Sequence, residues 1–108
     1  MNITEDYCSY EVYKLLKEKG FDGEIHTTFD EEGYTRPSIT HQMAIKWLRT
    51  KGIYIYIQPT KYVGGALYGF QAIVEDGRND DWKKSIHHED NYEEAVEAAL
   101  KYCLENLI

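Results

Sequence analysis

Isoleucine and tyrosine alternate strictly in Ile53-Tyr54-Ile55-Tyr56-Ile57, and this alternation constrains the fold more than any other sequence feature. Successive side chains of a β-strand point to opposite faces, so the isoleucines share one face and the tyrosines share the other. A strand with one apolar face needs neighbouring strands at its edges and helices over that face. The alternation therefore predicts an antiparallel sheet that is covered on one side.

A glycine pair, Gly64-Gly65, predicts how this strand pairs with the next one, which runs from Leu67 to Glu75. The two central residues of a tight hairpin turn need positive φ, which glycine adopts without steric cost. If Val63 opposes Ala66, the predicted pairs are Tyr54 with Glu75, Ile55 with Val74, Tyr56 with Ile73, and Ile57 with Ala72. The solvent face of the hairpin then carries amphipathic side chains, namely Tyr54, Tyr56, Gln58, Gln71 and Ile73.

Two less regular segments complete the predicted strands. In the first, Ile25, Thr27 and Phe29 alternate with polar residues. This pattern predicts a short half-buried edge strand, which is followed by a loop from Asp30 to Pro37. In the second, the residues from Trp82 to His87 predict a third strand of the meander. Pro59 cannot donate to a β-ladder, so it indicates an edge position or a bulge in its own strand.

Capping residues and apolar residues at helical spacing predict two helices before the hairpin. The first spans Ser9 to Lys19, with Ser9 as N-cap and Gly20 in the left-handed exit conformation. The second follows an N-cap at Thr40, runs from His41 to Arg49, and stops at Gly52.

The last helix has the strongest local signals in the chain. It begins at Asn91, where Glu94 completes a start resembling a capping box. We expect Glu97 to pair with Lys101 one turn further on. The buried stripe is predicted to contain Val96, Ala99, Leu100, Cys103, Leu104 and Leu107.

The order of these elements determines the predicted fold class. A helix, a strand, a helix, a hairpin with or without a third strand, and a final helix predict an α+β two-layer sandwich. In this fold, helices pack on one face of an antiparallel sheet of three or four strands. At 108 residues and 12.7 kDa, residues 1–108 are expected to form a single domain.

Charge and composition bound the partners and the compartment. The 19 acidic residues outnumber the 12 Lys and Arg residues, and the net charge of −7 repels phosphate backbones. No apolar run reaches the ~20 residues that cross a bilayer, and the first residues lack the features of a signal peptide. We therefore expect a cytoplasmic protein with no membrane partner. Cys8 and Cys103 are expected to be reduced and to pack as small apolar side chains.

The sequence predicts neither a metal site nor a cofactor. His87-His88-Glu89-Asp90 gathers potential metal ligands, but adjacent residues on an extended chain point in opposite directions. His26, His41 and Cys8 are the remaining groups for acid, base or nucleophilic chemistry, and nothing in their spacing pairs them. His41 is expected at the surface, because it lies in the first turn of a helix. No catalytic residue is predicted.

Aromatic residues provide the main indication of function. The chain has ten tyrosines, and tyrosine and tryptophan supply contact area to protein interfaces at modest entropic cost. The sequence therefore predicts a non-enzymatic interaction module that contacts a protein partner or a second copy of itself. The predicted contact residues are Tyr54, Tyr56 and Trp82.

Two other classes of function stay open. The order of the second helix, three strands and the last helix is that of double-stranded RNA-binding domains, although acidic residues stand where such domains need basic ones. An acidic chain could also imitate nucleic acid toward a DNA-binding protein. The third class is a small enzyme with a site made of histidine and cysteine residues.

Three helical segments carry a resemblance to a known family. They are the residues from Tyr13 to Phe21, from Thr40 to Arg49, and from Tyr92 to Leu107. In these segments the chain resembles a family of short proteins without an assigned activity, found in gut Bacteroidetes and their phages and mobile elements. The resemblance implies a small accessory protein of bacterial or phage origin, and it implies no cofactor or catalytic residue.

Overall fold

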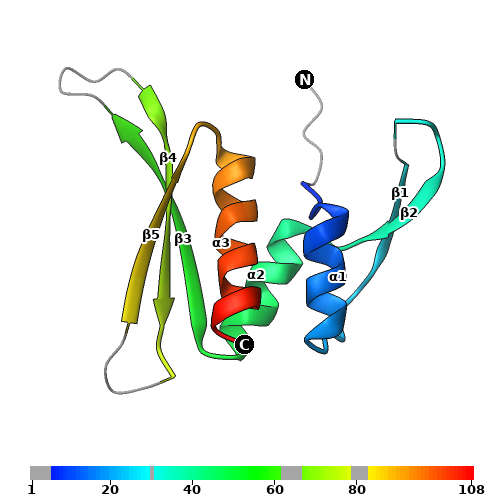
Figure 1. The fold of residues 1–108 in the computed structure, drawn as a ribbon, viewed down its shortest axis with the longest axis horizontal. Helices are drawn as coiled ribbons and strands as arrows, with labels where there is room; N and C mark the ends of the chain where they lie inside the picture. The colour runs from blue at the N-terminus through cyan, green and yellow to red at the C-terminus, as the bar shows by residue number, and fades with distance from the viewer. Residues whose placement is uncertain (1–5, 30, 62–66, 79–82) are drawn as a thin grey trace.

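Three helices and two separate antiparallel sheets make up the structure, a computed structural model that describes residues 6–29, 31–61, 67–78 and 83–108. Strands β3, β4 and β5 form a three-stranded sheet in that order, while β1 and β2 form a two-stranded ribbon. The predicted α+β class is confirmed, with α2 and α3 on one side of the three-stranded sheet (Figure 1). The elements are α1 (Tyr10–Glu18), β1 (His26–Phe29), β2 (Thr35–Ser38), α2 (His41–Thr50), β3 (Ile53–Lys61), β4 (Leu67–Asp76), β5 (Lys83–Glu89) and α3 (Tyr92–Asn106).

The predicted register of β3 and β4 is confirmed. The structure pairs Tyr54 with Glu75, Ile55 with Val74, Tyr56 with Ile73, and Ile57 with Ala72. The register shifts by one residue between Thr60 and Lys61, so that Lys61 pairs with Leu67. The predicted pair of Val63 and Ala66 lies outside the described residues. Pro59, which has no backbone N–H to donate, is accommodated in β3 because β3 is an edge strand of this sheet.

Burial distinguishes the two faces of the sheet at most positions, although Ile73, which is predicted on the solvent face, is only 8% exposed. Ile53, Ala72 and Val74 are buried on the side of the helices, and Ile55 is partly buried. Tyr56, on the opposite face, is 48% exposed. The alternation of isoleucine and tyrosine therefore separates a covered face from an open one, as expected from the pleat of a strand.

The helices stack outward from the sheet in successive layers. Helix α3 packs on all three strands, and α2 packs on β3 and on α3. Helix α1 packs on α3, and the ribbon of β1 and β2 lies beyond α1 (Figure 1). No helix in the described part of the chain is both long and apolar enough to span a bilayer. The core fills the space between these layers, and its largest fully buried side chains include Leu16, Ile39, Leu48, Ile53, Leu100 and Leu104.

Side-chain caps begin all three helices at the predicted residues. The side chains of Ser9, Thr40 and Asn91 each accept a hydrogen bond from the backbone N–H three residues further on. Gly20 and Gly52 adopt positive φ after α1 and α2, as the helix-exit prediction requires. These local signals fix the helix boundaries to within a residue or two.

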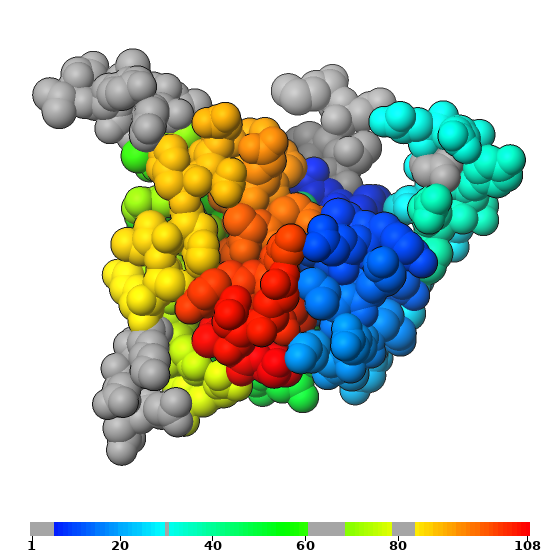
Figure 2. Space-filling model, in the orientation of Figure 1, coloured from blue at the N-terminus to red at the C-terminus, as the bar shows by residue number. Residues whose placement is uncertain are grey.

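Two predictions fail in the segment between α1 and α2. Residues 35–38 form strand β2 instead of continuing the predicted loop, because they pair with β1 from His26 to Phe29. The inward side of β1 is also the reverse of the predicted one, since His26 is half-buried and Phe29 is 73% exposed. The ring of Tyr7 covers His26 at a centroid distance of 5.8 Å, while the ribbon stands out from the body (Figure 2).

The predicted third strand of the meander exists as β5, which begins at Lys83 and pairs with β4. Trp82, the first residue predicted for that strand, lies outside the described residues. The buried stripe predicted for α3 is confirmed from Val96 to Leu104, and Leu107 is only partly buried.

Candidate functional site

On the solvent side of the three-stranded sheet, nine side chains form three rows that each cross β3, β4 and β5. We call this surface the open face. Paired residues of antiparallel strands point to the same side, so the registers of β4 with β3 and with β5 define the rows. The described helices lie on the other side of the sheet (Figure 1). The rows are Tyr54, Glu75 and Lys84; Tyr56, Ile73 and Ile86; and Gln58, Gln71 and His88.

The middle row is the apolar part of the open face. Tyr56 is 48% exposed on one edge strand and Ile86 is 58% exposed on the other. Ile73 lies between them on the central strand and retains 8% exposure. The row therefore forms one continuous apolar strip across the sheet, of the kind that protein interfaces bury at their centre.

The outer rows surround this strip with hydrogen-bonding groups. On one side, Nε2 of Gln71 donates a hydrogen bond of 3.1 Å to Oε1 of Gln58 across the strands. On the other side, Glu75 and Lys84 are Cα partners on adjacent strands and carry opposite charges. An apolar centre with a polar border resembles the anatomy of a protein-binding surface.

The structure brings together two of the three predicted contact residues. Tyr54 and Tyr56 both lie on the open face of β3, with Tyr54 half-buried and Tyr56 exposed. Trp82 cannot be placed because it lies outside the described residues. Sequence reasoning missed Ile86, the most exposed member of the apolar strip. Strand pairing could have identified Ile86, because a strand at 83–89 in antiparallel register with β4 places Ile86 opposite Ile73.

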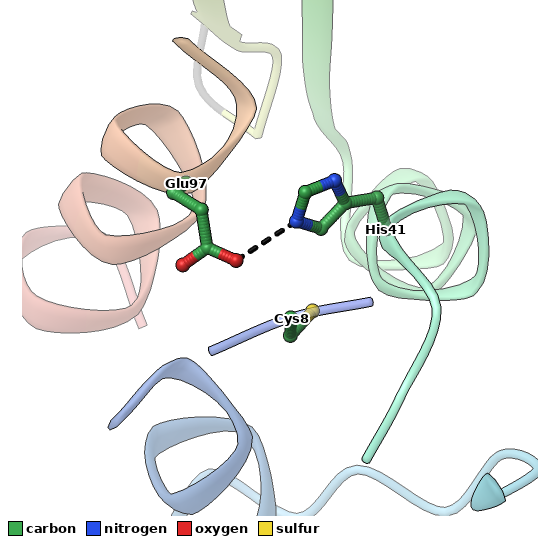
Figure 3. A group of neighbouring side chains, drawn as sticks. All are labelled: Cys8, His41 and Glu97. Atoms are coloured by element: carbon green, nitrogen blue, oxygen red, sulfur yellow. Dashed lines mark hydrogen bonds and ion pairs between the residues drawn. The ribbon is translucent and has the colours of Figure 1, made fainter. Parts of the chain in front are cut away.

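A second cluster, formed by Cys8, His41 and Glu97, was not expected from the sequence (Figure 3). One ligand atom from each of the three side chains lies within 4.8 Å of the others. The prediction that His41 lies at the surface is wrong, because the residue is 6% exposed. The position of His41 at the start of a helix does not indicate that the carboxylate of Glu97 on α3 packs against it.

Backbone pairing of the N-terminal segment brings Cys8 to this cluster. Tyr7 forms an isolated antiparallel bridge with Thr40. The N–H of Cys8 donates to the carbonyl of Ile39 at 2.8 Å, and the N–H of His41 donates to the carbonyl of Asp6 at 2.9 Å. The segment before α1 is therefore fixed beside the first residue of α2, although Cys8 and His41 are 33 positions apart in the chain.

Glu97 is the polar centre of the cluster. Its Oε1 accepts hydrogen bonds of 2.8 Å from Nε2 of His41 and of 2.8 Å from the backbone N–H of Ser9. Burial by itself raises the pKa of Glu97, but the hydrogen bonds from His41 and Ser9, together with the electrostatic attraction of His41, outweigh burial and lower that pKa. The predicted pair of Glu97 with Lys101 is wrong, since the Lys101 ammonium instead contacts Glu11 at 2.9 Å.

Cys8 does not have the properties of an activated nucleophile. Burial, followed by the negative charge of Glu97, raises the pKa of its thiol to about 12. Nε2 of His41 is already engaged by Glu97, and a base that activates a thiol must instead be hydrogen-bonded to that thiol. The arrangement therefore differs from a cysteine and histidine pair built for nucleophilic attack.

The other histidines lie apart from this cluster. His87 faces α3, where its ring lies 4.7 Å from the ring of Tyr102, and His88 lies on the open face of the same strand. The two adjacent histidines therefore point to opposite sides of β5, as the sequence predicts. His26 belongs to the ribbon, beside Tyr7.

Two surface pockets adjoin the cluster, and both are lined by Asp6 and His41. One has a volume of about 260 Å³ and is bordered mainly by acidic side chains, Asp6, Glu93, Glu94 and Glu97. The other, of about 360 Å³, extends along α2 toward Arg49. The carboxylate of Glu97 is thus reached from solvent through an acidic pocket.

The open face and the buried cluster are defined by their residues and their geometry. Comparison of the chain with models of protein families, with curated proteins and with solved structures finds no match.

Proposed function

We propose that this chain is a small non-enzymatic protein-interaction module whose open face binds a protein partner. The observation that supports the proposal is the apolar strip of Tyr56, Ile73 and Ile86, which crosses a sheet face that the described helices leave open. An accessory role in a bacterium or a phage is the setting that the sequence resemblance implies.

The free energy for binding comes from the strip and the specificity from its border. Burying an exposed isoleucine or tyrosine gives roughly 25 cal/mol per Å² of apolar area. Tyr56 adds a hydroxyl that stays hydrated in the free protein and that can hydrogen-bond to a partner. The amide groups of Gln58 and Gln71 offer further donors and acceptors beside the strip.

A different protein is a better partner for the open face than a second copy of this chain. Two copies each carry a net charge of −7 and repel one another at long range. Three rows on three strands span roughly 300 Å², from the usual spacings of a β-sheet, whereas stable interfaces bury about 800 Å² per partner. We therefore propose a transient complex with a partner whose surface has an apolar centre and a border of polar groups that complement Glu75, Lys84 and the two glutamines.

A photo-crosslinking amino acid at position 86, introduced in the source cell, tests this proposal. The matched control carries the same amino acid at position 34. Tyr34 is 68% exposed and lies just before β2, in the connection between the two strands of the ribbon. We expect position 86, but not position 34, to capture one dominant protein, which is then purified for binding measurements. Tyr56→Ser with Ile86→Ser should weaken its affinity by at least about tenfold.

Phe29→Ser and Tyr34→Ser form the control pair for affinity, since both residues are strongly exposed away from the open face. Circular dichroism and thermal unfolding establish that each variant is folded. Equal affinity of the open-face variants and the wild type would remove the proposal. So would a concentration-dependent dimer in sedimentation experiments that is lost in the Tyr56 and Ile86 variants.

One observation favours nucleic acid as an alternative partner, namely the element order from α2 through β3, β4 and β5 to α3. The charges oppose this alternative, because Glu89 and Asp90 lie just before α3, and Glu93 and Glu94 lie in its first turn. Titration with duplex RNA at low and high salt separates the two. Tight binding that weakens steeply with salt would support the alternative over a protein partner.

A further inference from the structure

The cluster of Cys8, His41 and Glu97 lies in the helical part of the molecule and plays no part in the open face. Three separate segments supply its members: the chain before α1, the first residue of α2, and the second turn of α3 (Figure 3). Backbone hydrogen bonds hold Cys8 and His41 in place, and Ser9 holds the carboxylate. The positions of the three side chains are therefore fixed by structure outside the cluster.

The ligand set and its spacing suit a tetrahedral metal ion. Sulfur, imidazole nitrogen and carboxylate oxygen are the three ligand types of protein zinc sites, at bond lengths of about 2.0–2.3 Å. Tetrahedral ligands at these bond lengths are separated by roughly 3.2–3.8 Å. His41 Nε2 and Glu97 Oε1 lie 2.8 Å apart, and all three ligand atoms lie within 4.8 Å of one another. Shifts of about 1 Å or less bring them to the separations that zinc needs.

We propose that Cys8, His41 and Glu97 bind one Zn²⁺ ion through Sγ, Nε2 and a carboxylate oxygen. Zn²⁺ takes the place of the hydrogen bond between His41 and Glu97, and it bonds to the Cys8 thiolate, whose proton leaves to solvent. The proton on Nε2 moves to Nδ1 of the same ring. Nδ1 is buried and has no hydrogen-bond partner among the described residues, so this exchange breaks no bond there.

Charge balance favours a divalent ion in this position. One thiolate and one carboxylate neutralise the ion, and the imidazole remains neutral. Without the ion, burial and the charge of Glu97 keep the Cys8 thiol protonated. A thiolate and an imidazole exclude Mg²⁺ and Ca²⁺, which prefer sets of oxygen ligands.

The acidic pocket supplies the access path. It is lined by Ser9, Glu93, Glu94 and two members of the cluster, His41 and Glu97. Its carboxylates attract cations from solution. Three protein ligands leave a fourth position, which water fills in sites of this kind.

Titration of the full chain with Co²⁺ and then with Zn²⁺ tests the proposal. We expect a thiolate-to-cobalt charge-transfer band in the near ultraviolet, which Zn²⁺ abolishes by displacement. Cys8→Ser should remove the band and weaken Zn²⁺ affinity by at least about 100-fold. Cys103→Ser is the matched control, because Cys103 is also a buried thiol whose pKa burial raises to about 12, but it belongs to no such cluster among the described residues. Its spectrum and affinity should match those of the wild type.

Two measurements on the wild type keep the proposal testable if Cys8→Ser does not fold. X-ray absorption of the zinc-loaded chain should resolve one sulfur ligand with nitrogen and oxygen ligands. Zn²⁺ affinity should rise about tenfold for each pH unit near neutrality, because binding releases the thiol proton. Absence of the sulfur ligand, unchanged affinity in folded Cys8→Ser, or a band lost in Cys103→Ser would each overturn the proposal.

Discussion

Nε2 of His41 donates a hydrogen bond of 2.8 Å to Oε1 of Glu97, which ties the first residue of α2 to α3. Ser9, the N-cap of α1, donates its backbone N–H to the same oxygen. One carboxylate therefore connects the starts of two helices to the body of a third. The charged form of Glu97 is the form that makes these bonds, so its ionisation is coupled to folding.

Acid should destabilise the protein in part through Glu97. The pKa of Glu97 is lower in the folded chain than its ordinary value of 4.5. As the pH falls below 4.5, the unfolded chain takes up the proton first, and the stability contributed by Glu97 is lost as the pH falls through the folded pKa. Glu97→Gln should lower the free energy of unfolding by about 1–2 kcal/mol at pH 7 and by less at pH 3. Urea unfolding with a chelator present measures this difference.

Glu105→Gln is the control for that experiment, because Glu105 is an exposed acid of the same helix that contacts Lys101 at the long distance of 3.9 Å. Its effect should stay below about 0.5 kcal/mol at both pH values. A Glu97→Gln effect that is equal at pH 7 and pH 3 would contradict the coupling.

Two isoleucines on opposite faces of the sheet should differ sharply in their contribution to stability. Ile53 is fully buried beneath the helices, whereas Ile86 is 58% exposed on the open face. Ile53→Ala should cost about 2–5 kcal/mol, because it removes buried methyl groups and leaves a cavity. Ile86→Ala should cost less than about 1 kcal/mol. Denaturant midpoints of the two variants measure the difference, and equal costs would contradict the assignment of the faces.

The ion pair of Asp76 and Arg78 should contribute to stability at the end of β4. The Asp76 side chain is buried, and the Arg78 guanidinium donates to both of its oxygens at 2.8 Å. Arg78→Ala should cost about 1–3 kcal/mol, at the lower end because Arg78 is partly exposed. Arg78→Lys should restore only part of the loss, since an ammonium cannot form the two-point contact. Full rescue by lysine in equilibrium unfolding would disprove the two-point contact.

Gly52 should tolerate alanine less well than Gly20 does. Both residues have positive φ, +84° and +96°, so alanine is strained at either position by about 1–2 kcal/mol. Only at Gly52 would the new Cβ meet another atom, Cγ of Arg78 at 3.0 Å. The pairing of Arg78 with Asp76 holds that side chain in place. Thermal unfolding of Gly52→Ala and Gly20→Ala tests this, and equal losses would show that Arg78 moves aside freely.

Sequence patterns predicted the parts of the fold that depend on neighbouring residues. The alternation at 53–57 assigned the faces of β3, and three polar residues marked the starts of the helices. These signals succeed because strand pleat and helix capping act over one to four residues. The predicted pairs of β3 and β4 from Tyr54 to Ile57 also agree with the structure, although Lys61 pairs with Leu67 and so departs from the register that a two-residue glycine turn would give.

The failed predictions share a dependence on distant contacts. Strand β2 is a strand because β1 pairs with it, and nothing in Thr35–Ser38 indicates that by itself. Glu97 was expected to pair along its own helix, but it turns toward His41, 56 residues earlier in the chain. Helical spacing gives the face on which a residue lies, but not the element that packs against it.

The sequence by itself determined the α+β class, the helix starts, and which face of the hairpin is apolar, since periodicity and capping encode these locally. Only the tertiary structure decided that Cys8, His41 and Glu97 meet, because residues so far apart in the chain come together through the packing of three helices. It also decided that Ile86 completes the apolar strip of the open face, since this depends on the place of β5 at the edge of the sheet.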